Sequence, residues 1–308
     1  MDLIYILGGF FGLIIGGSYL VSGAVALANR LGISPMIIGL TLVGFGTSMP
    51  ELVTSVQAAL IGSPGIAMGN VIGSNIANIL LILGIGAILA PIAVTKSVMA
   101  RDGSILVLAT VLCVAIVLYG FIGRIAGLGL IAILVTYLVV TIRSDQSAPS
   151  SQVDEVMHLP SPLRSVLILV GGLATTIFAA RFLVQGAVSV AAQWGMSETV
   201  IGLTVVAIGT SLPELMTTII AARRGQNDVA FGNVIGSNIF NILGILGATA
   251  VISPLNVPVA IIRLDIWVML AATTALVFFS MTGWRVSRRK GTVLLVGYGV
   301  YLAVLIAS

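Results

Sequence analysis

Ten apolar segments, each long enough to cross a lipid bilayer, dominate this chain. A transmembrane helix needs about 20 predominantly apolar residues, and segments of this kind lie at 3–27, 36–62, 67–91, 103–119, 122–142, 163–192, 199–222, 229–253, 262–281 and 291–307. Only 8% of the 308 residues are charged, too few to cover the surface of a soluble protein of this length. We therefore expect an all-α integral membrane protein with ten transmembrane helices in a lipid bilayer.

The second half of the chain repeats the first. The string MIIGLTLVGFGTSMPELVTS at 36–55 matches TVIGLTVVAIGTSLPELMTT at 199–218, and GNVIGSNIANIL at 69–80 matches GNVIGSNIFNIL at 232–243. Both pairs are 163 residues apart without a gap, which indicates a duplication and not chance similarity between apolar segments. The chain thus divides into a first membrane repeat (1–142), a polar linker (143–162) and a second membrane repeat (163–308).

Each repeat contains five apolar segments, and this odd number predicts their relative orientation. A second copy that begins after five crossings starts on the opposite side, so we expect two inverted five-helix repeats. Basic residues predict the absolute orientation, because cytoplasmic connections are enriched in Lys and Arg. The connections after the odd-numbered segments contain eleven: Arg30, Lys96, Arg101, Arg143, Arg164, Arg223, Arg224, Arg285, Arg288, Arg289 and Lys290. The other side has only Arg124 and Arg263, so we expect a plasma-membrane protein with a cytoplasmic linker and both termini outside.

Two of the ten acidic residues, Glu51 and Glu214, lie near the middle of an apolar segment, at equivalent positions of the two repeats. Placing a carboxylate there costs at least ~2.5 kcal/mol, and no basic residue lies at a comparable depth. Arg181 comes late in its segment, where its side chain can extend to the outer interface. A permeating cation is therefore the partner that we expect for the two carboxylates.

A proline precedes each of these glutamates, in the strings GTSMPE and GTSLPE. Proline removes a backbone donor and disfavours helix at the residue before it, so the second and seventh helices are expected to break near the midplane. Such a break would free carbonyl groups, which coordinate cations in transporters, near Gly44, Thr47, Ala207 and Thr210. The hydroxyls three and four residues before each carboxylate are expected on its own helix face: Thr47 and Ser48 beside Glu51, Thr210 and Ser211 beside Glu214.

The motif GNVIGSN provides a second set of oxygen ligands. Asn78 and Asn241 lie near the midpoints of the third and eighth segments, and Ser74 and Ser237 lie one turn earlier on the same face. We expect these two helices to be broken near the midplane as well. Carboxylate, hydroxyl, amide and carbonyl oxygens are the ligands of hard cations such as Ca²⁺ and Na⁺. Because no Cys or His lies at the site, neither a softer metal nor a cofactor is expected.

The paired GTSxPE and GNxxGSN segments resemble the alpha-repeats of the sodium/calcium exchanger family in its prokaryotic form, over all ten segments. The resemblance implies an antiporter that exchanges Na⁺ for Ca²⁺ by alternating access, with Glu51 and Glu214 as shared ion ligands. It implies the Thr, Ser and Asn side chains named above as further ligands, and the first and sixth helices as a sliding pair. The linker is too short for a cytosolic calcium-sensing domain. Asn241 stands where potassium-dependent relatives have Asp, which weighs against K⁺ co-transport.

The sequence alone leaves other functions open. The two glutamates could carry protons instead of Na⁺, as in a Ca²⁺/H⁺ exchanger of the same superfamily. A passive cation channel fits inverted repeats and broken helices less well. An intramembrane hydrolase would need a nucleophile–base pair or metal ligands, and the only histidine, His158, lies in the linker. The basic residues flank apolar segments and do not indicate nucleic-acid binding, and no obligatory protein partner is expected.

Cysteine accessibility tests the orientation. Cysteines introduced at Ser150, in the linker, and at Ser287, in the basic loop before the last segment, should resist membrane-impermeant thiol reagents in intact cells. Both positions are expected in the cytoplasm because of the asymmetry of basic residues. Ser308→Cys, expected outside, is the control that should be labelled. Labelling of both loop cysteines from outside would reverse the orientation.

Overall fold

The computed structural model describes residues 2–145, 161–194 and 207–307, which form a bundle of helices. The α-helices are α1 (Asp2–Leu31), α2 (Pro35–Ile38), α3 (Gly44–Thr47), α4 (Met49–Leu60), α5 (Pro64–Ala77), α6 (Gly84–Leu89), α7 (Lys96–Val98), α8 (Ser104–Tyr119), α9 (Arg124–Asp145), α10 (Pro162–Gln193), α12 (Ala207–Thr210), α13 (Leu212–Arg223), α14 (Asn227–Ile239), α15 (Gly247–Ile252), α16 (Ile266–Met281) and α17 (Arg288–Ala307). Segments of π-helix lie at Gly39–Val43, Asn78–Leu83, Met99–Gly103, Phe240–Leu246 and Ile261–Asp265. The strands are β1 (Ile92–Ala93), β2 (Phe121–Ile122), β3 (Leu255–Asn256) and β4 (Arg285–Val286).

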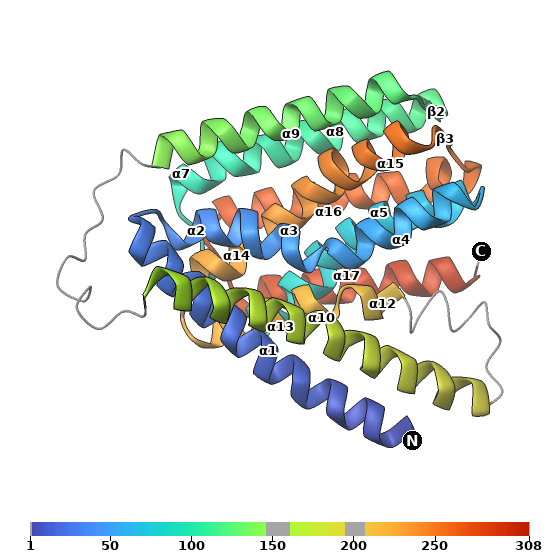
Figure 1. The fold of residues 1–308 in the computed structure, drawn as a ribbon. Coiled ribbons are helices and arrows are strands. Elements are labelled where there is room, and N and C mark those ends of the chain that lie inside the picture. Colours follow the sequence, from blue (N-terminus) through green and yellow to red (C-terminus); the bar gives the residue numbers. More distant parts are fainter. Residues whose placement is uncertain (1, 146–160, 195–206, 308) are drawn as a thin grey trace.

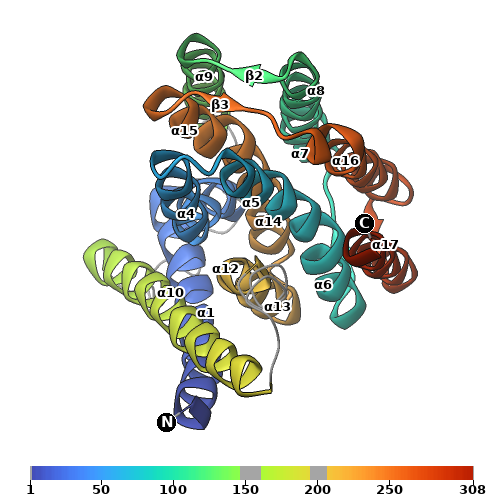
Figure 2. The same ribbon diagram turned by 90° about the vertical axis from the view of Figure 1, so that its right-hand side faces the viewer.

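The helices form three groups, which Figure 2 shows most clearly. The pair α1 and α10 cross each other on one side, α8, α9, α16 and α17 lie on the other, and α4, α5, α13 and α14 lie between. Burial follows this arrangement: the spans Pro64–Leu89 and Asn227–Ile252 are 78% and 83% buried, against 28–39% for the other spans. The two helices that contain the GNVIGSN motif are therefore central, and the outer helices expose apolar side chains to lipid.

Seven of the described helices are long and apolar enough to cross a membrane, and the bent pair Pro35–Thr47 and Met49–Leu60 makes an eighth span. Two of the ten expected segments are not among these. The segment 199–222 begins among residues that the structure does not describe. The segment 291–307 lies in α17, which begins with three basic residues, Arg288, Arg289 and Lys290. The chain is thus an all-helical membrane protein with seven to eight spans in its described part.

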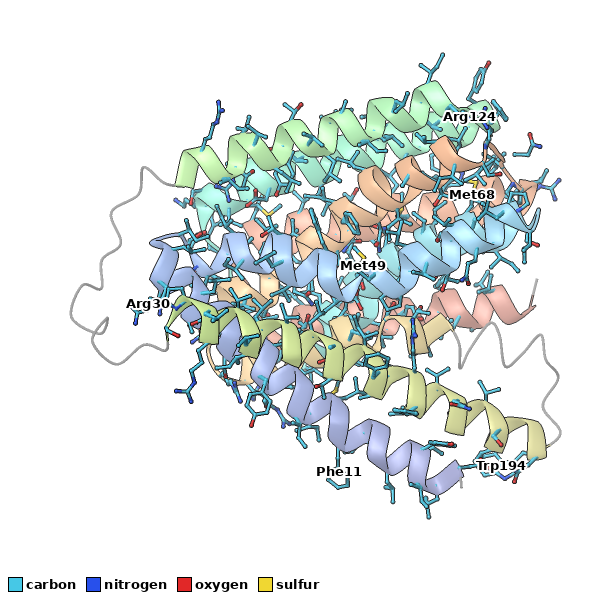
Figure 3. The ribbon with its side chains drawn as sticks, viewed as in Figure 1. Phe11, Arg30, Met49, Met68, Arg124 and Trp194 are labelled. Carbon is cyan, nitrogen blue, oxygen red and sulfur yellow. The ribbon has the colours of Figure 1, made fainter. Side chains whose placement is uncertain are left out.

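The helix that contains GTSMPE is bent by 43° between Thr47 and Met49. At the bend, Ser48 has φ −83° and ψ 7°, a conformation outside the α-helical region. The cause is Pro50, which lacks an N–H group and crowds the preceding turn. In the second repeat Ser211 has nearly the same conformation, φ −90° and ψ 7°, between α12 and α13. Figure 3 places Met49, the first residue after the bend, near the middle of the bundle.

The breaks expected within 67–91 and 229–253 are not found. Pro64–Leu89 and Asn227–Ile252 are each one continuous helical span. Each helix instead contains a π-helical segment, at Asn78–Leu83 and Phe240–Leu246. The physical reason is the position of the prolines: Pro64 begins its helix, and Pro91 and Pro254 follow the helix ends. Without an internal proline, a wider turn is accommodated by shifting hydrogen bonds instead of breaking the helix.

Equivalent elements of the two repeats contact each other reciprocally. Strand β1 is equivalent in sequence to β3, and β2 to β4, yet β1 pairs with β4 and β2 pairs with β3, both antiparallel. The Oγ1 atom of Thr110 lies 3.3 Å from Oγ1 of Thr273, its own equivalent 163 residues later. Contacts in which a residue meets its own equivalent are those that a two-fold axis produces.

The first and last helices share one end of the bundle: α1 begins there and α17 ends there (Figure 1). Arg30 and Arg124, which the sequence places on opposite sides of the membrane, lie at opposite ends of the bundle (Figure 3). This arrangement agrees with termini that share one side of the membrane.

Glycine allows α14 to approach the first repeat at backbone distance. A Cβ on Gly236 would overlap the backbone oxygen and Cα of Leu40, and a Cβ on Gly44 would lie 3.1 Å from the backbone N of Ser237. The central helix of the second repeat therefore packs directly against the backbone of residues 39–44 in the first.

Gly236→Ala should lower the thermal stability of the protein in detergent, by on the order of 1–3 kcal/mol, because backbone must move to admit the methyl group. The matched control is Gly129→Ala in α9, where no described atom lies within 4 Å of the added Cβ. Alanine also favours helix over glycine by about 1 kcal/mol. Thermal unfolding followed by size-exclusion chromatography compares the two variants, and equal midpoints would contradict this packing.

Candidate functional site

The two glutamates lie in the first turns of α4 and α13, in the centre of the bundle. Glu51 is 1% exposed and Glu214 is 2% exposed. Each follows a proline in the first turn of its helix, where the missing N–H group would have no helical acceptor in any case. The first turn also carries partial positive charge from the helix dipole. The proline break thus places each buried carboxylate where backbone dipoles favour it.

The serine hydroxyls cross between the repeats. Ser48 Oγ donates to Glu214 Oε1 at 2.9 Å, and Ser211 Oγ donates to Glu51 Oε1 at 3.3 Å. The expectation that each serine would lie beside the glutamate of its own repeat is therefore wrong. Helical spacing does not apply, because the chain leaves helical geometry at the serine itself. Each serine instead binds the carboxylate that the other repeat brings to the centre.

Thr47 also forms contacts near the carboxylates. Thr47 Oγ1 lies 3.0 Å from the carbonyl oxygen of Val43 and 3.3 Å from that of Gly44, so it is bonded to the last turn before the bend. Its Oγ1 also lies 3.3 Å from Oδ1 of Asn233, in the other repeat. Thr47 thus joins the two halves close to the carboxylates.

Two asparagines that the sequence analysis overlooked hold the glutamates in place. Asn70 Nδ2 donates to the backbone oxygen of Glu51 at 3.0 Å, and Asn233 Nδ2 donates to that of Glu214 at 3.1 Å. The Asn233 amide also donates to Thr218 Oγ1 at 2.9 Å, and its Oδ1 lies 3.3 Å from Thr47 Oγ1. Both asparagines belong to the repeated string GNVIGSN, and their identity in the two copies was the available signal.

The remaining expected ligands lie on the central helices. Ser237 Oγ donates to the carbonyl oxygen of Gly44 at 3.1 Å, which brings together two groups that were expected to bind the ion. Ser74 Oγ instead donates within its own helix, to the carbonyl of Asn70 at 2.6 Å. Ala207 begins α12, and the residues before it lie outside the described residues.

Asn78 and Asn241 are each 1% exposed and lie in the π-helical segments. The segment with Asn241 packs against α4, which contains Glu51, and the segment with Asn78 packs against α13, which contains Glu214. π-Helical turns occur frequently at functional sites, because a wider turn redirects the side chains that follow. Each π-helical segment with an asparagine thus packs against the helix of the opposite repeat that carries a glutamate.

Several buried oxygens at this centre lack a hydrogen-bond donor among the described residues. They are Oε2 of both Glu51 and Glu214 and Oδ1 of Asn75, Asn78, Asn238 and Asn241. Neither glutamate forms an ion pair within residues 2–145, 161–194 and 207–307. A buried polar atom without a partner is costly, and a buried charge far more so. These oxygens can be satisfied together by a cation that prefers oxygen ligands.

A cavity of about 380 Å³ reaches this centre from one side. It lies between α4, α10 and α12, and its polar lining consists of Thr54, Gln57, Arg181, Gln185 and Thr210. Pro50, which directly precedes Glu51, and Thr210, four residues before Glu214, also line it. The cavity therefore ends beside the two chain segments that carry the carboxylates.

A double-mutant cycle tests the crossed serine–glutamate bonds. Ser48→Ala and Glu214→Gln should be coupled by at least ~0.5 kcal/mol in thermal unfolding, because the two side chains share a buried hydrogen bond. Ser48→Ala and Glu51→Gln, the pair that lies three residues apart in the sequence, is the matched control and should show weaker coupling. Stronger coupling within the repeat than across it would refute the crossed arrangement.

Comparison with known proteins finds relatives over the whole length of both repeats. The family model for the sodium/calcium exchanger protein matches residues 1–143 and 164–307. The chain is 40% identical to the putative antiporter CaxA of Alkalimonas amylolytica, over 99% of this chain and 98% of that protein. It is 34% identical to the sodium/calcium exchanger MaX1 of Methanosarcina acetivorans, over 98% and 97%.

A solved structure of the sodium-calcium exchanger NCX_Mj, soaked with 10 mM Na⁺ and zero Ca²⁺, is similar over 98% of both chains, with a TM-score of 0.87 and 32% sequence identity. The agreement extends over both repeats and therefore includes the two motifs that surround the glutamates. The chain thus belongs to the sodium/calcium exchanger family of membrane transporters.

Proposed function

We propose that the chain is a secondary antiporter that exchanges Na⁺ for Ca²⁺ and binds both ions at the centre between the two repeats. The observation that carries this proposal is the pair of buried glutamates, each with an oxygen that lacks a partner among the described residues. A site with two uncompensated charges cannot move through a low-dielectric core at low cost. Release of one ion species must therefore be followed by uptake of the other, which couples the two fluxes.

The proposed ligands are oxygens from both repeats: Glu51, Glu214, Thr47, Thr210, Ser48, Ser211, Ser74, Ser237, Asn78 and Asn241, with the carbonyls of Gly44 and Ala207. Two carboxylates balance one Ca²⁺, and they leave a net charge of +1 when three Na⁺ occupy the site. Exchange is then expected to move net charge across the membrane. Because Asn241 is neutral, the site has no third carboxylate that would call for K⁺.

The proposed architecture is ten transmembrane helices in two inverted five-helix repeats. The reciprocal strand pairs and the contact of Thr110 with its own equivalent support a two-fold relation between the halves. The crossed Ser48–Glu214 and Ser211–Glu51 bonds support the same relation at the site. A duplicated unit with an odd number of crossings has this symmetry with its axis in the membrane plane.

Alternating access is supported by the one-sided cavity. At the equivalent place in the other repeat, a Cβ on Gly17 would lie 2.6 Å from Cδ1 of Ile220, so side chains fill that space. Arg224 Nη1 closes the same region with donations to the carbonyl of Ser18 at 2.9 Å and to Ser22 Oγ at 2.8 Å. A site that is open on one side and closed on the other corresponds to one state of an alternating-access cycle.

The orientation follows from the basic residues. Helices α4 and α10, which line the cavity, run towards the end of the bundle that carries the start of α1 and the end of α17 (Figure 1). With both termini outside the plasma membrane, as the asymmetry of Lys and Arg predicts, the open side is the outer one. We expect α1 and α10 to move together, because they pack against each other along their length.

Flux in proteoliposomes tests the proposed function. An outward Na⁺ gradient should drive ⁴⁵Ca²⁺ uptake, with or without K⁺, while the membrane voltage is clamped by an ionophore. Glu51→Gln and Glu214→Gln should reduce this uptake to background, because each removes half of the charge that balances Ca²⁺. Asp265→Asn is the matched control: this carboxylate lies in an outer helix, bonded to Tyr301, and its loss should leave exchange intact.

Each other outcome assigns a different function. Uptake driven by a proton gradient without Na⁺ would identify a Ca²⁺/H⁺ exchanger, in which the same glutamates carry protons. Uptake that ignores ions on the opposite side would identify a channel. Near wild-type exchange by either glutamine variant would contradict the central site, provided that the variant elutes as a folded protein.

A further inference from the structure

Arg181 lies within a membrane-spanning helix, yet it lines the cavity that reaches the carboxylate site. It belongs to the span Pro162–Val190 and is exposed, and it forms no hydrogen bond or ion pair in the part of the chain that the structure describes. A charged side chain inside a span is costly unless it faces water. Gln57 and Gln185 line the same cavity, so the surroundings of Arg181 are polar. The cavity is therefore expected to contain water.

The same cavity connects the arginine to the ion site. Pro50 and Thr210 both line the cavity; Pro50 directly precedes Glu51, and Thr210 lies four residues before Glu214. A cation that enters through this cavity must pass the guanidinium group on its way to the carboxylates. In water the potential of such a group is weakened but remains significant within about 8 Å at physiological ionic strength.

The duplication shows that the fold does not require this charge. The position equivalent to Arg181 in the first repeat is Ser18, and the position equivalent to Gln57 in the second is Ile220. Around Ser18 the space is filled, whereas around Arg181 it is open. The arginine near Ser18, Arg224, is bonded to the Ser18 carbonyl and to Ser22 Oγ, whereas Arg181 lines an open cavity, which indicates a role in access and not in packing.

We propose that Arg181 is a specificity-determining residue, whose positive charge lowers the affinity of the open site for divalent cations more than for monovalent cations. This inference rests on the proposed exchange of Na⁺ and Ca²⁺. The physical basis is that a fixed potential changes the local concentration of an ion by a factor that is exponential in its charge. The factor for Ca²⁺ is therefore the square of the factor for Na⁺. Ion for ion, the arginine therefore weakens the binding of Ca²⁺ more than the binding of Na⁺ on this side of the membrane.

The magnitude can be estimated from Coulomb's law. At low ionic strength, a unit charge about 10 Å from the ion in water changes the concentration of a monovalent cation about 2-fold, and hence that of a divalent cation about 4-fold. Arg181→Gln should therefore lower the half-saturating concentration of Na⁺ about 2-fold and that of Ca²⁺ about 4-fold. Arg181→Lys keeps the charge and should resemble the wild-type protein.

The experiment measures equilibrium binding of ⁴⁵Ca²⁺ and its competition by Na⁺ on purified protein in detergent, at low and high choline chloride. Arg289→Gln is the matched control, because Arg289 is an exposed arginine at the start of α17 and does not line the cavity. Its loss should change neither affinity. The effect of Arg181→Gln should shrink at high ionic strength, where the Debye length falls to about 3 Å at 1 M.

Three outcomes would overturn the inference: equal shifts for Na⁺ and Ca²⁺, an Arg181→Lys variant that behaves like Arg181→Gln, or a shift that does not respond to ionic strength. Each would indicate that the shape of the side chain acts, and not its charge. Failure of the proposed function is a distinct result, since the wild-type protein would then neither bind Ca²⁺ competitively with Na⁺ nor exchange the two ions. If the wild-type protein exchanges the two ions and Arg181→Gln binds them with unchanged affinities, only the role of Arg181 is refuted.

Discussion

The burial of two negative charges inside a bundle surrounded by lipid is the constraint on which the rest of this structure depends. Glu51 and Glu214 are almost inaccessible, and each accepts only part of the hydrogen bonds that a carboxylate can accept within the described residues. Removing such groups from water is costly, and hydrogen bonds, helix dipoles and, in the function that we propose, a bound cation offset that cost. The neighbouring prolines, hydroxyls and amides are arranged around this requirement.

The two repeats together supply the groups that surround the buried carboxylates. Because Ser48 binds Glu214 and Ser211 binds Glu51, neither repeat contains a complete site. Each half supplies a carboxylate and receives a hydroxyl, and the same reciprocity links the π-helical segments to the opposite α4 and α13. A substitution in one copy therefore disturbs the ligands of the other, which explains physically why two matching sets of polar residues are needed at one centre.

Some features could be predicted from the sequence because they depend on residue type alone. Apolar length predicted membrane helices, and the bend at GTSMPE followed from proline chemistry. Other predictions failed for local reasons. The expected breaks near Asn78 and Asn241 are π-helical turns, since no proline interrupts those helices. The role of Asn70 was missed because its bond to the Glu51 carbonyl joins two helices, which no spacing within one helix reveals.

The sequence by itself determined the inventory of the site: two glutamates without a basic partner, hydroxyls, amides and a proline break, each present twice. Only the tertiary structure decided which hydroxyl binds which carboxylate, because the two contacts join residues 166 and 160 positions apart. It also decided that the space beside Arg181 is open while the equivalent space beside Ser18 is filled. Periodicity reports the neighbours of a residue along its own helix, whereas a site between two repeats is built from contacts across helices, which depend on how the repeats pack.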